Sequence, residues 1–384
     1  MTTLSVPLMA VISVPRGWRL GLPFIGALAA GWVTESMPII GSAAFAVAIL
    51  FAWVQLPVIS KAQTRLVGLG TILAILMFIG AVGQAWNPLD GSDHLTVSFG
   101  FAALFMLSVL AAGMPRAVLL SGFQIMRYAG ILGSIYAWIA MTWVGRVYGP
   151  VHLNPNAFAG FLAFTAMQWL VLQERITARH ALIAGFLFSG IVFTGSRWAL
   201  LISGLAVLLL FVWRKLPLHG AIIIGACVIL AIWAATAPAS SVLRVGVVSA
   251  PTSPTEVVPV AAATAVKTVT MAAVSAKSRL AVPVTPGFMP RGYLGGKLNG
   301  NTMHSIYQRA AVETGWIGLG LFLTALWSAL RSGNKQHRLL LLFLAALGIM
   351  DFYTWIGVQL VPVLWATMAI AVTDRQNLSA EEPV

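Results

Sequence analysis

The chain has 384 residues, of which 59% are hydrophobic and only 9% are charged, and its mean hydropathy is +0.91. About a quarter of the residues of a soluble domain are charged, so this composition excludes the soluble class and indicates a polytopic membrane protein. The net charge of +13 would suggest nucleic acid binding in a soluble protein, but here most basic residues lie at the ends of apolar segments. No nucleic acid partner is therefore expected. Cys227 is the only cysteine and lies in an apolar segment, so neither a disulfide nor a thiolate metal site is available.

Twelve apolar segments, each near the length needed to cross a bilayer, follow one another along the chain. Backbone polar groups cannot go unpaired in lipid, and the segments are too long for barrel strands, so we expect each to be a helix. We predict them at residues 20–33, 39–58, 66–85, 95–112, 119–144, 156–173, 181–195, 198–213, 218–236, 314–330, 338–355 and 358–373. The predicted fold is all-α, with a single integral membrane domain over residues 1–384. We expect the first span to be retained, because no small-residue cleavage site follows it.

Basic residues in the short connections indicate the orientation of the chain. With the N-terminus in the cytoplasm, thirteen of the 23 basic residues fall on the cytoplasmic side: Arg16, Arg19, Lys61, Arg65, Arg116, Arg175, Arg179, Arg214, Lys215, Arg331, Lys335, Arg338 and Arg375. The short outer connections hold only two basic residues, Arg146 and Arg197, while Arg127 lies within the fifth span and could belong to either side. The even number of spans then places both termini in the cytoplasm.

One long outer connection, about residues 237–303, joins the ninth and tenth spans. It carries a single acid, Glu256, and six basic residues: Arg244, Lys267, Lys277, Arg279, Arg291 and Lys297. Its first part is rich in Ala, Val, Ser, Thr and Pro, a composition typical of a flexible connector. Its second part, about residues 278–303, places basic residues among Gly and Pro and is expected to fold over an anion site. The alternative is that its charge is incidental or serves lipid headgroups, because long loops translocate largely regardless of charge.

Two short motifs lie on the same predicted outer face. In Leu153-Asn-Pro-Asn-Ala-Phe-Ala-Gly, either Asn154 or Asn156 can cap the following helix, and the proline between them suits its first turn. A helix start alone explains this motif. In Thr194-Gly-Ser-Arg-Trp, Arg197 lies at the membrane edge, where it either extends to the lipid headgroups or contacts a substrate.

The third motif, Met303-His-Ser-Ile-Tyr-Gln-Arg-Ala-Ala-Val-Glu-Thr-Gly-Trp-Ile-Gly, begins just before the tenth span. On a helix, His304 would share a face with Tyr307 and Gln308, and Glu313 follows near the membrane entry. A lone histidine is more often a hydrogen-bonded structural group. Beside an arginine-rich loop, however, an imidazole that titrates near neutral pH is a candidate proton acceptor.

The order of these motifs resembles the O-antigen ligase superfamily of bacterial inner-membrane glycosyltransferases. The resemblance rests on Asn154-Pro-Asn-Ala-Phe-Ala-Gly, Gly195-Ser-Arg, the long outer loop and His304 with the downstream Glu313-Thr-Gly-Trp-Ile-Gly, and it covers about residues 150–330. It implies a twelve-span enzyme with a large periplasmic loop between spans nine and ten. Such ligases transfer a glycan from undecaprenyl diphosphate to a sugar of the lipid A core at the periplasmic face, without a required metal. The implied partners are this glycan donor, the lipid A core acceptor and membrane lipid.

The resemblance also implies roles for single residues. Arg197 matches the family's first essential arginine, Ser278-Arg279 is similar to its loop arginine, and His304 matches the histidine proposed as base. The sequence after Arg279 lacks the family's usual aromatic residue, so Arg291 and Arg244 remain alternatives for the diphosphate-binding loop arginine. The supporting candidates are Asn154, Asn156, Arg146, Tyr307, Gln308 and Glu313.

The chemistry of such a transfer favours these residue types. The departing diphosphate gains charge, which a divalent metal or fixed cations can stabilise. The predicted outer carboxylates are few and scattered along the sequence, so we expect arginine to do this without a metal or cofactor. The planar guanidinium pairs two donors with phosphate oxygens and stays charged.

Two other interpretations use the same features. An O-antigen polymerase or a protein O-oligosaccharyltransferase resembles this chain in donor and topology but has another acceptor. A transporter of an anionic lipid or sugar would account for the intramembrane residues Arg127 and Asp351, although the sequence has no convincing internal repeat. A purely structural membrane subunit would leave His304 and the outer arginines unexplained.

Overall fold

The computed structural model describes residues 18–33, 38–55, 59–86, 93–141, 147–149, 154–213, 215–236, 288, 290, 305–350 and 360–380. Within these ranges the regular structure is helical and contains no strand. The all-α class predicted from the sequence is confirmed.

Each predicted apolar segment corresponds to one long helix in the described part of the chain. In order these are α1 (Leu22–Val33), α2 (Pro38–Gln55), α3 (Lys61–Trp86), α4 (Asp93–Ala111), α5 (Arg116–Ala140), α6 (Pro155–Val171), α7 (Ala178–Thr194), α8 (Arg197–Val212), α9 (Leu218–Thr236), α13 (Gly315–Ser332), α14 (Lys335–Met350) and α15 (Val361–Ala380). A short 3-10 turn, η2 (Trp18–Gly21), precedes α1. The eight-residue helix α12 (Ile306–Glu313) precedes α13.

Three of the described helices are long and apolar enough to cross a membrane unaided: Lys61–Gly83, Arg116–Ala140 and Leu218–Ala235. Several others are apolar but shorter. The outer surface of α9 is also apolar, because only 17% of its hydrophobic window is buried and Ile229 and Trp233 are both about two-thirds exposed. Exposed apolar area on this scale is costly in water and costs little in lipid. The helices therefore indicate a membrane-associated bundle.

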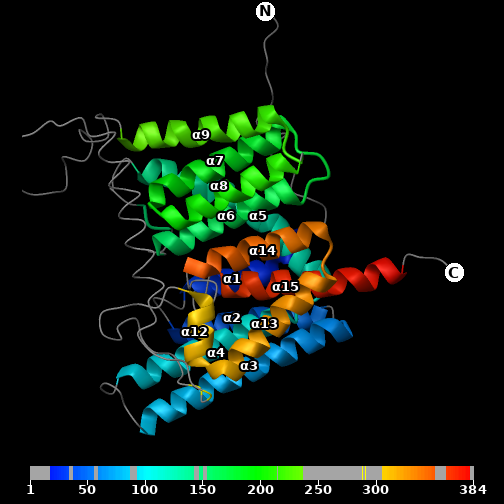
Figure 1. Ribbon diagram of the computed structural model, residues 1–384. Helices are drawn as coiled ribbons and strands as arrows, with labels where there is room; N and C mark the ends of the chain where they lie inside the picture. The colour runs from blue at the N-terminus through cyan, green and yellow to red at the C-terminus, as the bar shows by residue number, and fades with distance from the viewer. Residues whose placement is uncertain are drawn as a thin grey trace, which may run out of the picture.

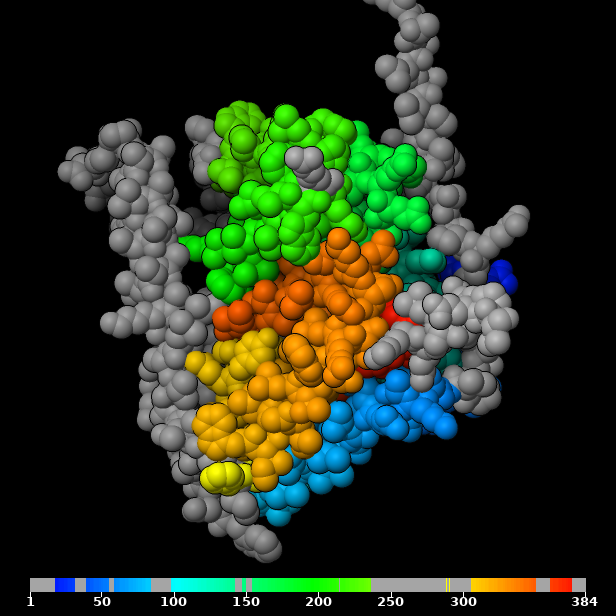
Figure 2. All heavy atoms as spheres, turned by 45° about the vertical axis from the view of Figure 1, so that its right-hand side comes forward, coloured from blue at the N-terminus to red at the C-terminus, as the bar shows by residue number. Residues whose placement is uncertain are grey.

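The helices run side by side in one bundle with two distinct ends (Figure 1). On one flank α7 packs against α9, α6 and α5, and on the other α13 packs against α3, α12 and α15. α14 contacts both groups through α6, α8, α13 and α15, and Figure 2 shows α7 to α9 and α13 to α14 forming one continuous face. α12 lies at one end of the bundle, here called the α12 end. The α6–α7 and α13–α14 connections and the last turns of α15 lie at the opposite end (Figure 1).

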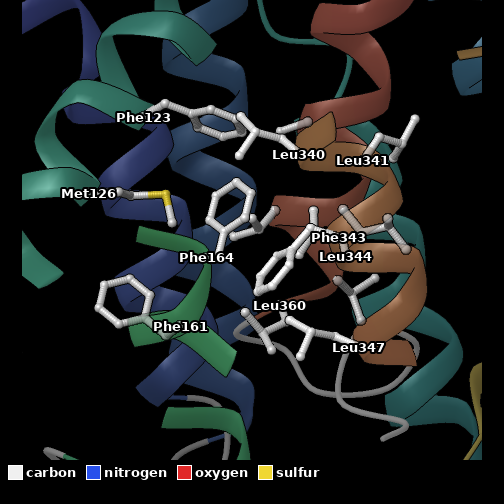
Figure 3. Packing of buried hydrophobic residues seen from close by; sticks show 14 of the residues in the cluster. Phe123, Met126, Phe161, Phe164, Leu340, Leu341, Phe343, Leu344, Leu347 and Leu360 are labelled. Carbon is white, nitrogen blue, oxygen red and sulfur yellow. The ribbon is translucent and has the colours of Figure 1, made fainter. Parts of the chain in front are cut away.

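α6 is the central helix of its flank and is buried on every side. All of its residues except Asn156 are buried. Phe164 lies between Phe123 of α5 and apolar side chains of α14 (Figure 3), and its ring meets that of Phe123 edge-on with centroids 5.6 Å apart. Gly130 lets α5 approach α6 closely, and a Cβ at this position would overlap the Thr165 side chain. These contacts fix the second half of α6 relative to α5 and α14.

A network of ionic and hydrogen bonds joins α5, α14 and α15 at the end opposite α12. The Asp374 carboxylate accepts hydrogen bonds from Arg116 Nη2 at 2.9 Å, His337 Nδ1 at 2.7 Å and the Asn334 amide at 2.8 Å. Burial alone would raise the pKa of this carboxyl, which lies just beyond the predicted span 358–373. The hydrogen bonds from His337 and Asn334, the charge of His337 and the hydrogen bond from Arg116 outweigh burial and lower the pKa below its ordinary value.

We expect Asp374→Asn to lower the thermal unfolding temperature at neutral pH, and the difference from wild type to shrink in acid. A carboxyl with a depressed pKa stabilises the fold above its unfolded pKa, and this contribution is lost as pH falls through the folded pKa. Thermal unfolding of the detergent-purified protein from about pH 7 to about pH 3 measures the effect. The exposed Glu174, changed to Gln, is the control. A constant difference between Asp374→Asn and wild type across this range would contradict the assigned role.

Candidate functional site

The described residues include Asn154, Asn156, Arg197, Tyr307, Gln308 and Glu313 among those predicted for the site. Arg146, Arg244, Arg279, Arg291 and His304 lie outside the described residues, as does nearly all of the loop over residues 237–303. Their roles stay predictions. The geometry of the site therefore comes from the helix ends that flank these segments.

Arg197 begins α8 directly after a tight turn from α7. Gly195 ends α7 in the left-handed conformation with φ of 68°, which glycine adopts without the steric cost of a Cβ. Thr194 Oγ1 accepts a hydrogen bond from the Ser196 amide at 3.2 Å and donates one to the Ile191 carbonyl at 2.7 Å. Hydrogen bonds within the turn thus hold its backbone in place. The exposed side chain of Arg197 follows directly after this turn.

The N-terminus of α8 has no group that offsets its positive charge in the first turn. A helix N-terminus carries partial positive charge, so a cation placed there costs roughly 0.3–1 kcal/mol instead of stabilising the helix. No acidic residue occupies the first turn of α8, and Ser196 makes no side-chain cap. Arg197 and the first backbone N–H groups of α8 therefore both contribute positive potential at the same place. The N-terminus of α8 is therefore electropositive, and a role for this charge in binding stays a prediction.

The N-terminus of α8 and the helix α12 meet at the same end of α14. Trp198, next to Arg197, donates from Nε1 to the Leu347 carbonyl at 3.1 Å. Tyr307 of α12 donates from its hydroxyl to the Ala345 carbonyl at 3.1 Å. The two acceptors are two residues apart, or about 3 Å along a helix axis. Leu347 also lies in the last turn of α14, where carbonyls lack an intrahelical partner, so Trp198 satisfies a group that would otherwise be unpaired.

Asn154 is the N-cap of α6. Its side chain accepts a hydrogen bond from the Asn156 amide at 2.9 Å, and a proline occupies the first turn. The helix-cap interpretation of this motif is confirmed, while a further role for either asparagine stays a prediction. The first half of α6 also lies close to the start of α15. At Gly160 the approach is so close that a Cβ would come within 2.7 Å of Leu360 Cδ1.

Glu313 forms a buried ion pair with Arg309, one turn earlier in α12. Arg309 Nη1 lies 2.8 Å from Glu313 Oε1, and the two side chains are 1% and 0% exposed. Removing two charges from water costs several kcal/mol per ion, so such a pair depends on close contact between its members. Glu313, predicted as a supporting residue, therefore has a structural partner. Sequence reasoning missed Arg309, although the i,i+4 spacing of opposite charges on a helix was the signal that could have found it.

The turn between α12 and α13 explains the glycines that follow Glu313. Gly315 has φ of 72°, a conformation that side chains with a Cβ rarely adopt. A Cβ on Gly318 would overlap the Thr314 side chain. This turn lets α12 run across the end of the bundle instead of continuing along α13 (Figure 1). Much of the Glu-Thr-Gly-Trp-Ile-Gly motif is thus required by backbone geometry.

Tyr307 fixes α12 to α14 through its hydroxyl. Burial raises the pKa of this phenol, so it remains a neutral hydrogen-bond donor under ordinary conditions. Its ring also contacts Phe322 of α13, with centroids 6.2 Å apart. Gln308, the next residue, is half-buried, and its supporting role stays a prediction. The segment that directly follows His304 in sequence is therefore anchored to two other helices.

The comparisons with known proteins assign no family. No protein-family model matches the chain, and a search of curated proteins finds no significant match. The resemblance inferred from the motifs stays a prediction.

We expect Arg309→Met or Glu313→Gln alone to destabilise the protein by about 3–5 kcal/mol, because each leaves one buried charge without its partner. The double variant Arg309→Met/Glu313→Gln should be more stable than the sum of the single effects predicts, since it removes both charges. Thermal unfolding of the four proteins in detergent measures this coupling. Additive losses would show that the two side chains do not depend on each other.

Proposed function

We propose that the chain is a glycosyltransferase of the O-antigen ligase type. It transfers a glycan from undecaprenyl diphosphate to a sugar of the lipid A core. In this proposal twelve helices cross the bacterial inner membrane, both termini are cytoplasmic, and the α12 end is periplasmic. The basic α6–α7 and α13–α14 connections at the opposite end support this orientation, because cytoplasmic loops are rich in Lys and Arg.

The observation that carries the proposal is the meeting of two predicted site segments on α14. The segment containing Arg197 and the segment that follows His304 are over a hundred residues apart in sequence. Both are hydrogen-bonded to carbonyls near the C-terminal end of α14, at Leu347 and Ala345. A phosphate-binding group and a proton acceptor have to lie near each other for the transfer, and this packing supports that requirement.

Arg197 is the proposed contact for the diphosphate. Its guanidinium is exposed beside the uncapped N-terminus of α8. As the sugar–phosphate bond breaks, the leaving diphosphate gains charge, and donors already aimed at that charge lower the barrier. One of the loop arginines, Arg279, Arg291 or Arg244, is the proposed second contact. Fixed cations serve here because Glu313, the described carboxylate of α12, is paired with Arg309.

His304 is the proposed general base. The acceptor hydroxyl has to lose its proton as its oxygen attacks the anomeric carbon, and a positioned imidazole contributes about 10² to 10⁴ in rate. Nearby arginines would keep the imidazole neutral, the form that accepts a proton. The anchoring of α12 through Tyr307 and the Arg309–Glu313 pair gives the segment after His304 a rigid support.

We expect His304→Ala and Arg197→Ala each to reduce glycan attachment by about a hundredfold or more, without changing the amount of protein in the membrane. The assay is the quantity of glycan-modified lipid A core in cells whose own ligase is absent. Arg65→Ala and Arg331→Ala are matched controls, because both arginines are exposed and lie on the predicted cytoplasmic side.

Near-normal attachment in either site variant would contradict the proposal. Long glycan retained on the polyprenyl lipid, with unmodified lipid A core, would instead identify a polymerase. Glycan on protein would identify a protein O-oligosaccharyltransferase.

We expect the purified enzyme to remain active in excess chelator, because arginines stabilise the leaving diphosphate in this mechanism. Glycan transfer is measured with purified donor and acceptor in EDTA, before and after magnesium is added back. Loss of transfer in EDTA and its recovery with magnesium would show that a divalent ion performs this role.

A further inference from the structure

Tyr148 lies between α5 and α6 in the chain and exposes its aromatic ring. The residues on either side of it are buried: Val147 is 1% exposed and belongs to the apolar core, and Gly149 is buried as well. Tyr148 itself is 52% exposed. Its side chain takes part in no hydrogen bond or ring contact with the residues that the structure describes. The segment is therefore fixed by its buried residues, while the tyrosine ring is available to a ligand.

The end of α7 holds this segment in place. The Val147 amide donates a hydrogen bond to the Phe193 carbonyl at 3.0 Å, and Phe193 lies in the last turn of α7. The Phe193 ring is itself held by α5, because it meets the Trp138 indole edge-on with centroids 4.8 Å apart. Trp138 also donates from Nε1 to Ser189 Oγ at 2.8 Å. The backbone next to Tyr148 is thus tied to both α5 and α7.

These contacts bring Tyr148 close to the segment that carries Arg197. Phe193, whose carbonyl holds Val147, and Arg197 flank the turn at Gly195, where α7 ends at the α12 end of the bundle (Figure 1). A tight turn brings residues three positions apart to within about 7 Å of each other. Both Tyr148 and Arg197 are exposed. Two long side chains on the two sides of one turn can therefore contact the same ligand.

The chemistry of an aromatic ring beside a cation favours a sugar phosphate. An exposed tyrosine near the end of a membrane bundle is often only an interfacial anchor, but such an anchor needs no fixed place beside a particular arginine. Aromatic rings also bind sugars, because the C–H groups on one face of a pyranose meet the electron-rich face of the ring. In a glycan donor the diphosphate is bonded directly to the first sugar. A ring beside the diphosphate contact therefore lies where that sugar is expected.

We propose that Tyr148 binds the first sugar of the glycan donor by stacking on an apolar face of its pyranose ring. The inference rests on the proposed function and on Arg197 as the diphosphate contact. Arg197 holds the charged part of the donor at one side of the turn, and Tyr148 orients the sugar at the other. Because Tyr148 gains no charge and moves no proton in the transfer, its loss weakens donor binding more than it slows the chemical step.

The test compares two lipids on the purified full-length chain by native mass spectrometry. One is undecaprenyl diphosphate, and the other is the same lipid carrying a galactose residue, whose ring has one face lined by C–H groups. We expect wild type to bind the galactosyl lipid more tightly. Tyr148→Ala should weaken binding of the galactosyl lipid by about three- to tenfold, the effect of one aromatic contact, and leave binding of the bare lipid unchanged.

Further variants separate the ring from the other properties of this side chain. Tyr148→Phe and Tyr148→Trp keep a ring that can stack, so both should retain the preference for the galactosyl lipid. Tyr148→Leu keeps apolar bulk without a ring and should bind as Tyr148→Ala does. Tyr136→Ala is the matched control, because Tyr136 is also an exposed tyrosine and lies in the last two turns of α5, near the same end of the bundle. It should bind both lipids as wild type does.

Kinetics distinguish the donor sugar from the acceptor sugar. In the transfer assay Tyr148→Ala should raise the KM for the donor and leave kcat and the KM for the acceptor close to wild type. A rise in the acceptor KM alone would place the ring on the acceptor and overturn the proposal. Equal binding of both lipids by wild type, equal weakening of both by Tyr148→Ala, or a preference retained in Tyr148→Leu would overturn it as well.

Failure of the proposed function gives a different result. Arg197→Ala should weaken binding of both lipids, because it removes the contact with the diphosphate that they share. Wild-type binding of both lipids by Arg197→Ala would contradict the proposed diphosphate contact. The difference between the two lipids in Tyr148→Ala tests the sugar contact by itself.

Discussion

The hydrogen bonds from Trp198 and Tyr307 to the last turns of α14 are the contacts on which the α12 end depends. They satisfy backbone carbonyls and, at the same time, join two segments that are distant in sequence. At its other end α14 is held by the hydrogen bonds of His337 and Asn334 to Asp374. Because α14 is held at both ends and contacts both segments, the position of Arg197 relative to α12 depends on the packing of the whole bundle.

Charge in the described part of the chain divides into two kinds. Arg309 and Glu313 are buried together, and Asp374 is surrounded by donors, so these charges are explained by the fold itself. Arg197 and Arg127 belong to no described ion pair: Arg197 begins α8, and Arg127 lies halfway along α5. The first stands where a helix N-terminus already favours an anion, and the second is stacked on an indole. The proposed diphosphate contact would account for the first.

Hydropathy predicted the fold class and the place of each long helix, because lipid allows few alternatives for the backbone. It misplaced helix ends where hydrogen bonding continues into polar sequence. α3 starts five residues before its predicted span, where Ser60 accepts a hydrogen bond from the Gln63 amide. The cap at Asn154 was predictable from local chemistry, and the pairing of Arg309 with Glu313 could have been. The contact of Arg116 with Asp374 joins residues 258 positions apart, and one sequence alone offers no signal for it.

The complete burial of α6 has a consequence for how the protein is made. One of its faces is covered by α14, which leaves the ribosome long after α6 itself. Until then Phe164 has its neighbour Phe123 of α5 but lacks the apolar side chains of α14. The burial of α6 is thus completed late in biogenesis. A product that stops after α9 would enter the membrane with one face of α6 still uncovered.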